Sequence, residues 1–232
     1  KARSAAYSLS SRALSQSFPL TAGPRWRIRE HAHSKKATLD AWSDMPDPIR
    51  AVLLELNSPA FLARLGEITG FAGLEADPTL YGGGMHLSGP GSFLDVHVDF
   101  STHPDTHHRR ALNLLIYLTE DWDEAWGGHL ELWGNQRAWT VAPMFNRAVL
   151  FETSDHSWHG HPTPLACPAG QVRKSLALYY YLPEPAKHHT TIYVMTPNEI
   201  RRLKAANETF TMRMPDGRHV RSDDMVLEEA AR

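Results

Sequence analysis

The segment from residue 80 to residue 182 constrains the fold most, because short apolar or alternating runs recur there between turn residues. Many strand-length runs with turn signals between them are typical of a β-sandwich or barrel. Eight runs have this character, at 80–87, 92–98, 111–118, 129–133, 138–141, 147–152, 156–162 and 173–182. The sequence therefore predicts a mainly β core with flanking helices.

Two helices are predicted upstream of this core, within residues 46–69. Asp47-Pro48 can open the first helix, while Ser58 and Pro59 supply an N-cap and a first-turn proline for the second. Gly70 follows as a stop signal. We expect three regions, with residues 1–78 as an N-terminal arm and supporting helices, 79–183 as the core, and 184–232 as a C-terminal extension packed on the core.

Composition argues against several classes of protein. The chain has 24 Lys+Arg against 26 Asp+Glu, a net charge of −2, whereas dedicated nucleic-acid binders usually carry a basic excess. No run approaches the roughly 18 apolar residues that a membrane span needs. The one cysteine, Cys167, cannot form an internal disulfide. We expect a cytoplasmic chain that binds neither nucleic acid nor membrane, with a docked arm at its serine-rich start.

Histidine is the residue type in unusual supply, with 14 copies. His97 and Asp99 lie two apart at the end of a predicted strand, so both side chains point to the same face. An imidazole and a carboxylate side by side offer two ligands for a metal ion. Because a His-x-Asp pair also arises often by chance, this pair needs further support.

A second group of histidines supplies that support. His156, His159 and His161 lie on a later predicted strand, and any one of them would complete a set of two histidines and one carboxylate. This set is the facial triad of non-haem Fe(II) oxygenases, which leaves coordination positions open. Arg173, which opens the last strand run, could bind a dicarboxylate end-on. The adjacent Lys174 should point to the opposite face, outward.

With these residues in view, residues 80–183 resemble the Fe(II)/2-oxoglutarate-dependent dioxygenases, specifically the prolyl 4-hydroxylase-like branch. The resemblance rests on an ordered set of blocks: His97-Val98-Asp99-Phe100, residues 109–118, Trp122 with Gly127-Gly128-His129-Leu130-Glu131-Leu132, residues 143–147, Ser157-Trp158-His159-Gly160, and Arg173-Lys174-Ser175-Leu176-Ala177. It implies a double-stranded β-helix, or jelly roll, in which two antiparallel sheets form a flattened barrel.

The resemblance also implies roles for individual residues. Fe(II) would be held by His97, Asp99 and His159, with His161 as the fallback for the third position. Arg173 and Tyr117 would bind the distal carboxylate of 2-oxoglutarate. Asn113, four residues before Tyr117, would share its face and line the same cavity. The branch often has a tyrosine shortly before the His-x-Asp pair, and this chain lacks one at 85–89.

The activity implied is hydroxylation of a C–H bond, with 2-oxoglutarate and O₂ as co-substrates and ascorbate as a further reductant. A carboxylate at Asp99 favours hydroxylation, because related halogenases have a small residue there. The first choice of acceptor is a prolyl residue of a peptide or protein, and the second is a free amino acid or another small metabolite. Candidate substrate contacts are Arg109, Arg110 and His103.

Two other readings remain open on the sequence. The first is a catalytically silent jelly-roll domain that binds a glycan or a partner. The second is a cupin-type, metal-dependent hydrolase that uses the cluster of His156, His159 and His161. The oligomeric state is not readable from the sequence.

Overall fold

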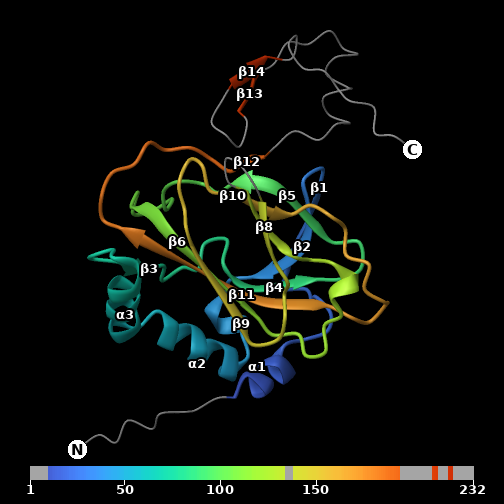
Figure 1. Cartoon of the computed structure of the whole chain (residues 1–232). Helices are drawn as coiled ribbons and strands as arrows, with labels where there is room; N and C mark the ends of the chain where they lie inside the picture. Colours follow the sequence, from blue (N-terminus) through green and yellow to red (C-terminus); the bar gives the residue numbers. More distant parts are fainter. Residues whose placement is uncertain (1–9, 134–137, 194–210, 214–218, 222–232) are drawn as a thin grey trace, which may run out of the picture.

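The computed structural model describes residues 10–133, 138–193, 211–213 and 219–221 (Figure 1). Its centre is two runs of four antiparallel strands. The first run, in spatial order, is β4 (Gly84–Ser88), β11 (Arg173–Leu182), β6 (Arg109–Tyr117) and β9 (Arg147–Glu152). The second is β5 (Phe93–Val98), β10 (Trp158–His161), β7 (Leu130–Trp133) and β8 (Ala138–Val141). Each of the eight predicted runs overlaps one of these strands, and the predicted double-stranded β-helix is confirmed.

One further strand connects the two runs. β2 (Ser34–Leu39) pairs with β4 through Ala37 and Leu87, and with β5 through Ser34 and Leu94. β1 (Arg27–His31) pairs with β2 and is exposed along its whole length. Neither strand is predicted from the sequence, because residues 27–39 are rich in charge and lack an apolar alternation. A segment from the expected N-terminal arm is therefore part of the same hydrogen-bonded sheet as the core.

Helices cover one face of the first strand run (Figure 1). They are α1 (Ser11–Ser17), α2 (Asp47–Leu56) and α3 (Pro59–Thr69), with short 3-10 turns at Trp42–Asp44 and Glu124–Trp126. The two predicted helices are confirmed, since the Ser58 side chain accepts a hydrogen bond from the Phe61 amide and Gly70 has a left-handed φ of 79°. No helix in the described part of the chain is long and apolar enough to cross a membrane.

The two faces of β11 have different tasks. Leu176, Leu178 and Tyr180 are fully buried in the core shared with the helices. The alternate residues, including Arg173 and Ser175, line a cavity between the two strand runs. Because side chains alternate along a strand, one strand can complete the apolar core and also supply polar groups to a site.

Lys174 belongs to the helix-facing set. Its side chain does point away from Arg173, as predicted, but the prediction that it points outward is wrong. Helix α1 covers this position, so that Lys174 is buried and its Nζ donates a hydrogen bond to the carbonyl oxygen of Ser15 at 3.0 Å.

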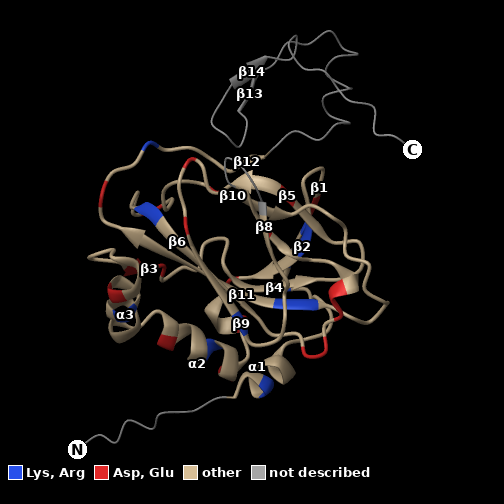
Figure 2. Ribbon diagram, viewed as in Figure 1, with Lys and Arg blue, Asp and Glu red and all other residues tan. Residues whose placement is uncertain are grey.

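Three short strand pairings complete the fold. β3 (Glu75–Ala76) pairs with β11, and β12 (Ile192–Tyr193) pairs with β5. β13 (Thr211–Arg213) and β14 (His219–Arg221) pair with each other. The pattern Thr196-Pro197-Asn198-Glu199, a capping box that predicts a helix start, lies outside the described residues. Basic and acidic residues are interspersed along the described ribbon (Figure 2).

Candidate metal and co-substrate site

The pairing of β5 with β10 brings the predicted metal ligands together. His97 and His159 are directly opposite each other in the antiparallel register, and Asp99 follows the end of β5. One ligand atom from each of the three side chains lies within 4.8 Å of the other two. The Nε2 atom of His97 is 3.5 Å from Oδ1 of Asp99, and that of His159 is 3.3 Å from Oδ2. This is the geometry of a group that can hold one divalent cation.

The two imidazole rings are oriented by backbone carbonyl groups. Nδ1 of His97 lies 2.8 Å from the oxygen of Asp95, and Nδ1 of His159 lies 2.8 Å from the oxygen of Ser157. An Nδ1–H that donates to a carbonyl leaves Nε2 as the unprotonated atom, and this arrangement is typical of metal-binding histidines. Burial, together with nearby His159, lowers the pKa of His97 and so favours the neutral form that binds metal. The donor set therefore fits a non-haem iron ion.

The other two histidines of the cluster are placed differently. His156 is exposed in the loop before β10. His161 is buried and lines the cavity, but it lies beyond a register irregularity and is not a member of the three-residue group. Its Nδ1 has no hydrogen-bond partner among the described residues.

Asp99 is held from behind by two side chains of β6. Arg110 Nη2 lies 2.9 Å from Oδ2 of Asp99, and Asn113 Nδ2 donates to the same oxygen at 2.8 Å. Arg110 Nε in turn donates to Oδ1 of Asn113 at 2.9 Å. Burial opposes ionisation of Asp99, but the charge of Arg110, with His159, holds its pKa well below the usual range. Asp99 is therefore an ionised carboxylate in a buried site.

Two of the candidate substrate contacts, Arg109 and Arg110, border one cavity beside Asp99, whereas His103 does not. Arg110 is buried, and its guanidinium lies 3.4 Å from the centre of the Tyr179 ring, so most of its surface is already in contact with protein. Arg109 forms an ion pair with Glu184 at 2.5 Å. His103 is not brought into the site, because it is buried beside Asp77, with Nε2 3.2 Å from the carboxylate.

From β11, Arg173 faces the cavity between the two strand runs, and Tyr117 of β6 contacts Arg173. Nη2 of Arg173 donates to the hydroxyl oxygen of Tyr117 at 3.2 Å, and the guanidinium carbon lies 4.7 Å from the centre of the tyrosine ring. Burial raises the pKa of Tyr117, so the phenol keeps its proton and can donate it. Nε of Arg173 is buried and has no hydrogen-bond partner among the described residues. An orphaned guanidinium atom beside a phenol proton fits the carboxylate of a bound acid.

The cavity between these two groups is the candidate co-substrate site. Besides the metal group, its lining comprises Lys36, His86, Ser88, Leu94, Asn113, Leu115, Leu130, Phe151, Gly160, His161, Arg173, Ser175 and Tyr179. Lys36 comes from β2, the strand that the sequence did not predict. His86 comes from the segment where the expected tyrosine is missing. A weak signal for Lys36 is present in the sequence, since Ser34, Lys36 and Thr38 would share one face of a strand.

A second cavity adjoins the metal group on the other side of Asp99. It has a volume of about 340 Å³ and is bounded by Phe100, Arg109, Arg110, the loop 153–156 and the segment 186–189. Segment 186–189 is held beside this cavity by Ser101, whose hydroxyl donates a hydrogen bond to the Lys187 carbonyl oxygen at 2.8 Å. A cavity of this size is typical of small-ligand sites.

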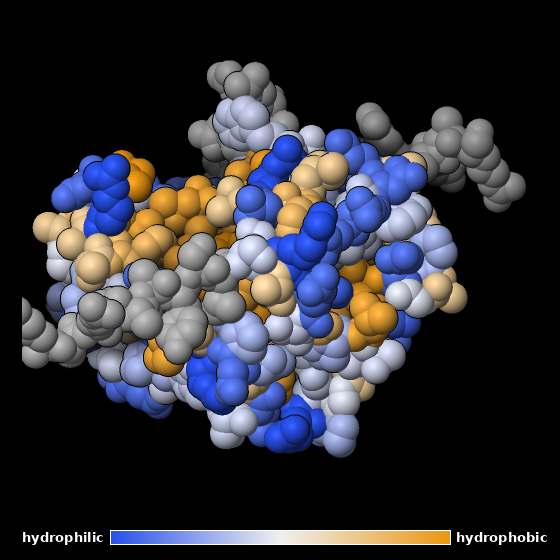
Figure 3. Space-filling model, turned by 90° about the horizontal axis from the view of Figure 1, so that it is seen from below, coloured by the Kyte–Doolittle hydropathy of each residue, from blue (hydrophilic) through white to orange (hydrophobic). Residues whose placement is uncertain are grey.

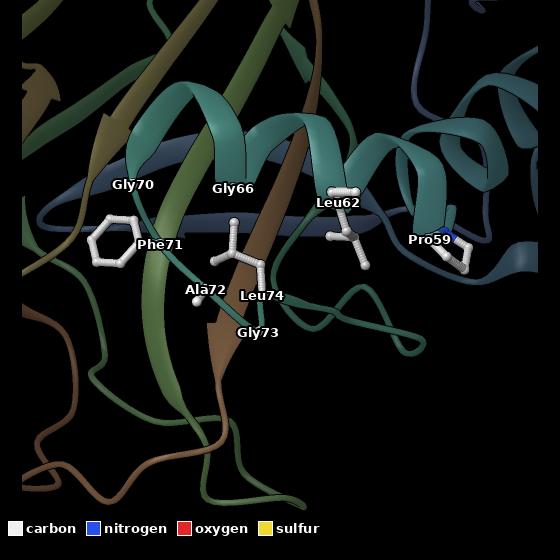
Figure 4. A pocket seen from close by; sticks show the side chains of 9 residues that line it. Pro59, Leu62, Gly66, Gly70, Phe71, Ala72, Gly73 and Leu74 are labelled. Carbon is white, nitrogen blue, oxygen red and sulfur yellow. The ribbon is translucent and has the colours of Figure 1, made fainter.

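A third hollow, which shares no lining residue with the first two cavities, lies between α3 and the residues that follow it (Figure 4). It is lined by Pro59, Leu62, Ala63, Gly66, Gly70, Phe71, Ala72, Gly73 and Leu74. Apolar residues are also visible on the surface seen from the helical side (Figure 3). The groove contains no titratable side chain, and it offers no group for catalysis or metal binding.

Comparisons with known proteins match the segment that carries the site. Residues 83–181 match the family described as the 2OG-Fe(II) oxygenase superfamily. No curated protein matches the chain. The match spans all eight strands of the two runs, from β4 to β11.

Solved structures give weaker likenesses. A prolyl-4-hydroxylase from Pseudomonas putida is 20% identical, with a TM-score of 0.49 over 68% of this chain and 77% of that one. A prolyl hydroxylase from Trichoplax adhaerens, in complex with a peptide fragment of hypoxia inducible factor, is 18% identical, with a TM-score of 0.48 over 68% of this chain and 71% of that one. HygX from Streptomyces hygroscopicus, with nickel, 2-oxoglutarate and hygromycin B bound, is 13% identical, with a TM-score of 0.41 over 69% of this chain and 72% of that one. These scores are too low to transfer a substrate.

Proposed function

We propose that the chain belongs to the 2OG-Fe(II) oxygenase superfamily, which residues 83–181 match, and that it is an Fe(II)- and 2-oxoglutarate-dependent dioxygenase that hydroxylates a C–H bond. One observation carries the proposal. The ligand atoms of His97, Asp99 and His159 lie within 4.8 Å of one another, and they share one cavity with Arg173. A binding module would not need both a metal group and a carboxylate group in the same cavity.

Each side chain has a defined task in this proposal. His97, Asp99 and His159 would hold Fe(II), and the ionised Asp99 fills the position that halogenases leave open. The chemistry that Fe(II) supplies when bound is the activation of O₂, with conversion of 2-oxoglutarate to succinate and CO₂ and of an acceptor C–H to C–OH. Arg173 and Tyr117 would bind the distal carboxylate of 2-oxoglutarate, through one guanidinium N–H and the phenol proton.

Asn113 supports the metal group and lines the co-substrate cavity. Its amide donates to Asp99, and its carbonyl oxygen accepts from Arg110. It is therefore a positioning residue for the carboxylate ligand. Tyr193 of β12 lies against His97, with ring centres 5.4 Å apart, where β12 pairs with β5.

For the acceptor we propose the cavity on the other side of Asp99. Its volume and its position next to the metal group suit a single residue of a peptide or a small metabolite. A prolyl residue of a peptide or protein is the first candidate, and a free amino acid or another small metabolite is the second. Arg109 and Arg110 line this cavity and would face the acceptor from β6.

The remaining expectations are also proposals. O₂ as the second co-substrate and ascorbate as a reductant follow from the chemistry proposed for the site. A cytoplasmic location is supported by the single cysteine, and the even balance of charge supports a chain without a nucleic-acid partner.

The test is turnover of 2-oxoglutarate by the purified chain with Fe(II). We expect succinate to form and candidate acceptors to gain one oxygen, which mass spectrometry detects. Proline-containing peptides and free amino acids are tested side by side. Asp99→Ala and His159→Ala should each lower succinate formation by at least about 100-fold, because each removes a metal ligand.

His107→Asn is the matched control, because His107 is exposed, lies outside both cavities and has a left-handed φ of 59° that asparagine tolerates. It should leave turnover unchanged. No succinate with any acceptor would contradict the proposal and favour a silent binding module. Zinc content with hydrolytic turnover and no oxygen uptake would instead favour the cupin-type hydrolase.

A further inference from the structure

Strand β2 places a lysine in the co-substrate cavity. Ala37 pairs with Leu87, so Lys36, one position earlier on β2, lies beside Ser88 on β4. Ser88 in turn pairs with Arg173 on β11. Lys36, Ser88 and Arg173 therefore form a row across three neighbouring strands, and all three line the cavity. Because neighbouring strands are about 4.8 Å apart, the two cationic residues start roughly 10 Å apart and can reach one small ligand.

The charges of this cavity are unbalanced. Lys36 has no ion pair or hydrogen bond with any side chain of the described residues. Asp99 is the one carboxylate in the described lining, and Arg110 and Asn113 already occupy it. Nε of Arg173 is a buried donor without a hydrogen-bond partner among the described residues. Apart from Asp99, the described lining thus offers these two cations no anionic side chain.

Burial adds to the cost of this arrangement. It lowers the pKa of Lys36 to about 8, and the charge of Arg29 acts in the same direction. Asp99 raises this pKa, while Arg173 and Arg110 lower it by smaller amounts. Burial also lowers the pKa of His86 well below its ordinary value, so that this neighbour is neutral near pH 7 and adds no third positive charge. A bound anion would relieve the repulsion between the cations.

We propose that Lys36 is a second cationic anchor for the distal carboxylate of the keto-acid co-substrate, on the opposite side of that carboxylate from Arg173. This inference rests on the proposed function. Arg173 and Tyr117 approach from β11 and β6, and Lys36 approaches across Ser88 from β2. Two cations around one carboxylate would make the site selective for 2-oxo acids that carry a second carboxylate.

The test is a binding measurement without turnover. Protein loaded with Mn(II) in the absence of oxygen is titrated by calorimetry with 2-oxoglutarate and, separately, with 2-oxopentanoate, which keeps the keto-acid end and lacks the distal carboxylate. Lys36→Met should raise the Kd for 2-oxoglutarate by about 10- to 100-fold, because it removes a charge-assisted hydrogen bond. The Kd for 2-oxopentanoate should stay within about twofold, since that ligand has no distal carboxylate to lose.

Two further variants control for folding and for charge. Lys36→Arg should keep most of the affinity, and Lys35→Met, which removes an adjacent exposed lysine paired with Glu30, should change neither Kd. If Lys36→Met does not fold, as judged by circular dichroism, Lys36→Gln takes its place.

The outcomes separate this inference from the proposed function. Wild-type protein that binds Mn(II) but no 2-oxoglutarate contradicts the proposed function, and the inference fails with it. Wild-type protein that binds 2-oxoglutarate, with an unchanged Kd in Lys36→Met, contradicts the inference alone. An equal loss of affinity for both ligands also contradicts the inference, because Lys36 would then act on the keto-acid end.

Discussion

Asp99 is the side chain with the most extensive support in the site. Its Oδ1 faces His97. Its Oδ2 accepts a hydrogen bond from the Asn113 amide and lies 2.9 Å from Nη2 of Arg110. The rings of Tyr179 and Phe100 pack around the Arg110 guanidinium, with centres 3.4 and 4.5 Å from its central carbon. Arg110 is therefore fixed before any ligand binds, and it determines where the carboxylate of Asp99 points.

Replacement of Arg110 by glutamine should weaken metal binding. Asp99 would lose its ion pair and could rotate away from the two imidazole groups. We expect the Kd for Mn(II), measured by calorimetry, to rise by about 10- to 100-fold, as for other residues that orient a metal ligand. Arg109→Gln is the control, because its partner Glu184 is exposed and lies away from the metal group. An unchanged Kd in Arg110→Gln would show that Asp99 keeps its position without this support.

The sequence identifies the site residues that lie in compact motifs. His97, Asp99, His159 and Arg173 line the predicted cavity, and Tyr117 contacts Arg173. The positions of Lys36 and His103 could not be predicted from strand spacing. Lys36 lies on a charged segment with no apolar pattern, and only the register of β2 brings it inward. His103 follows the ligand pair closely in sequence, but a buried contact with Asp77 directs it elsewhere.

At the scale of elements, the contact between β10 and β5 determines how far apart the metal ligands lie. Gly160, between His159 and His161, packs directly on the backbone of β5. A Cβ atom at this position would lie 2.7 Å from the oxygen of Leu94 and 2.8 Å from that of Asp95. Real Cβ atoms do not approach backbone oxygens so closely, so only glycine allows this register without a shift.

Gly160→Ala should therefore separate the two strands. We expect the free energy of unfolding, measured in urea, to fall by about 1–3 kcal/mol, in the range found for overpacked sites. Metal affinity should fall as well, since His159 moves with β10. Gly89→Ala serves as the comparison, because its added Cβ would make only an ordinary contact with Val172 at 3.9 Å. Equal losses in the free energy of unfolding for the two substitutions would show that the close contact of Gly160 with β5 is not the cause.

The strands that form the β-helix are predictable because each overlaps an apolar or alternating run between turn residues. β1 and β2 are not predictable, because they form through pairing with other strands and their sequences show no local strand pattern. The five residues of β1 are all exposed, and β2 carries two lysines among its first three residues. Helices α2 and α3 are predictable down to the cap, since Ser58 and Gly70 act through local hydrogen bonds and backbone geometry.

At the scale of the whole molecule, β2 is the strand through which the two strand runs are hydrogen-bonded to each other. Residues 34–39, which belong to the predicted N-terminal arm, thus complete the described sheet. The boundary predicted between residues 78 and 79 remains a prediction, but it does not separate two independent sheets, because residues 34–39 pair with β4 and β5.

This placement couples ligand binding to the order of the N-terminal strand. An acid held by Lys36 on β2 and Arg173 on β11 spans three strands, so thermodynamic linkage requires that it stabilise their association. Addition of Mn(II) and 2-oxoglutarate should slow amide hydrogen exchange in residues 34–39 more than in residues 147–152 of β9, and Lys36→Met should abolish the difference. Uniform slowing in both segments would mean that the acid does not bridge the strands. If the difference is found, the co-substrate acts as a removable cross-link that fastens the start of the chain to its catalytic barrel.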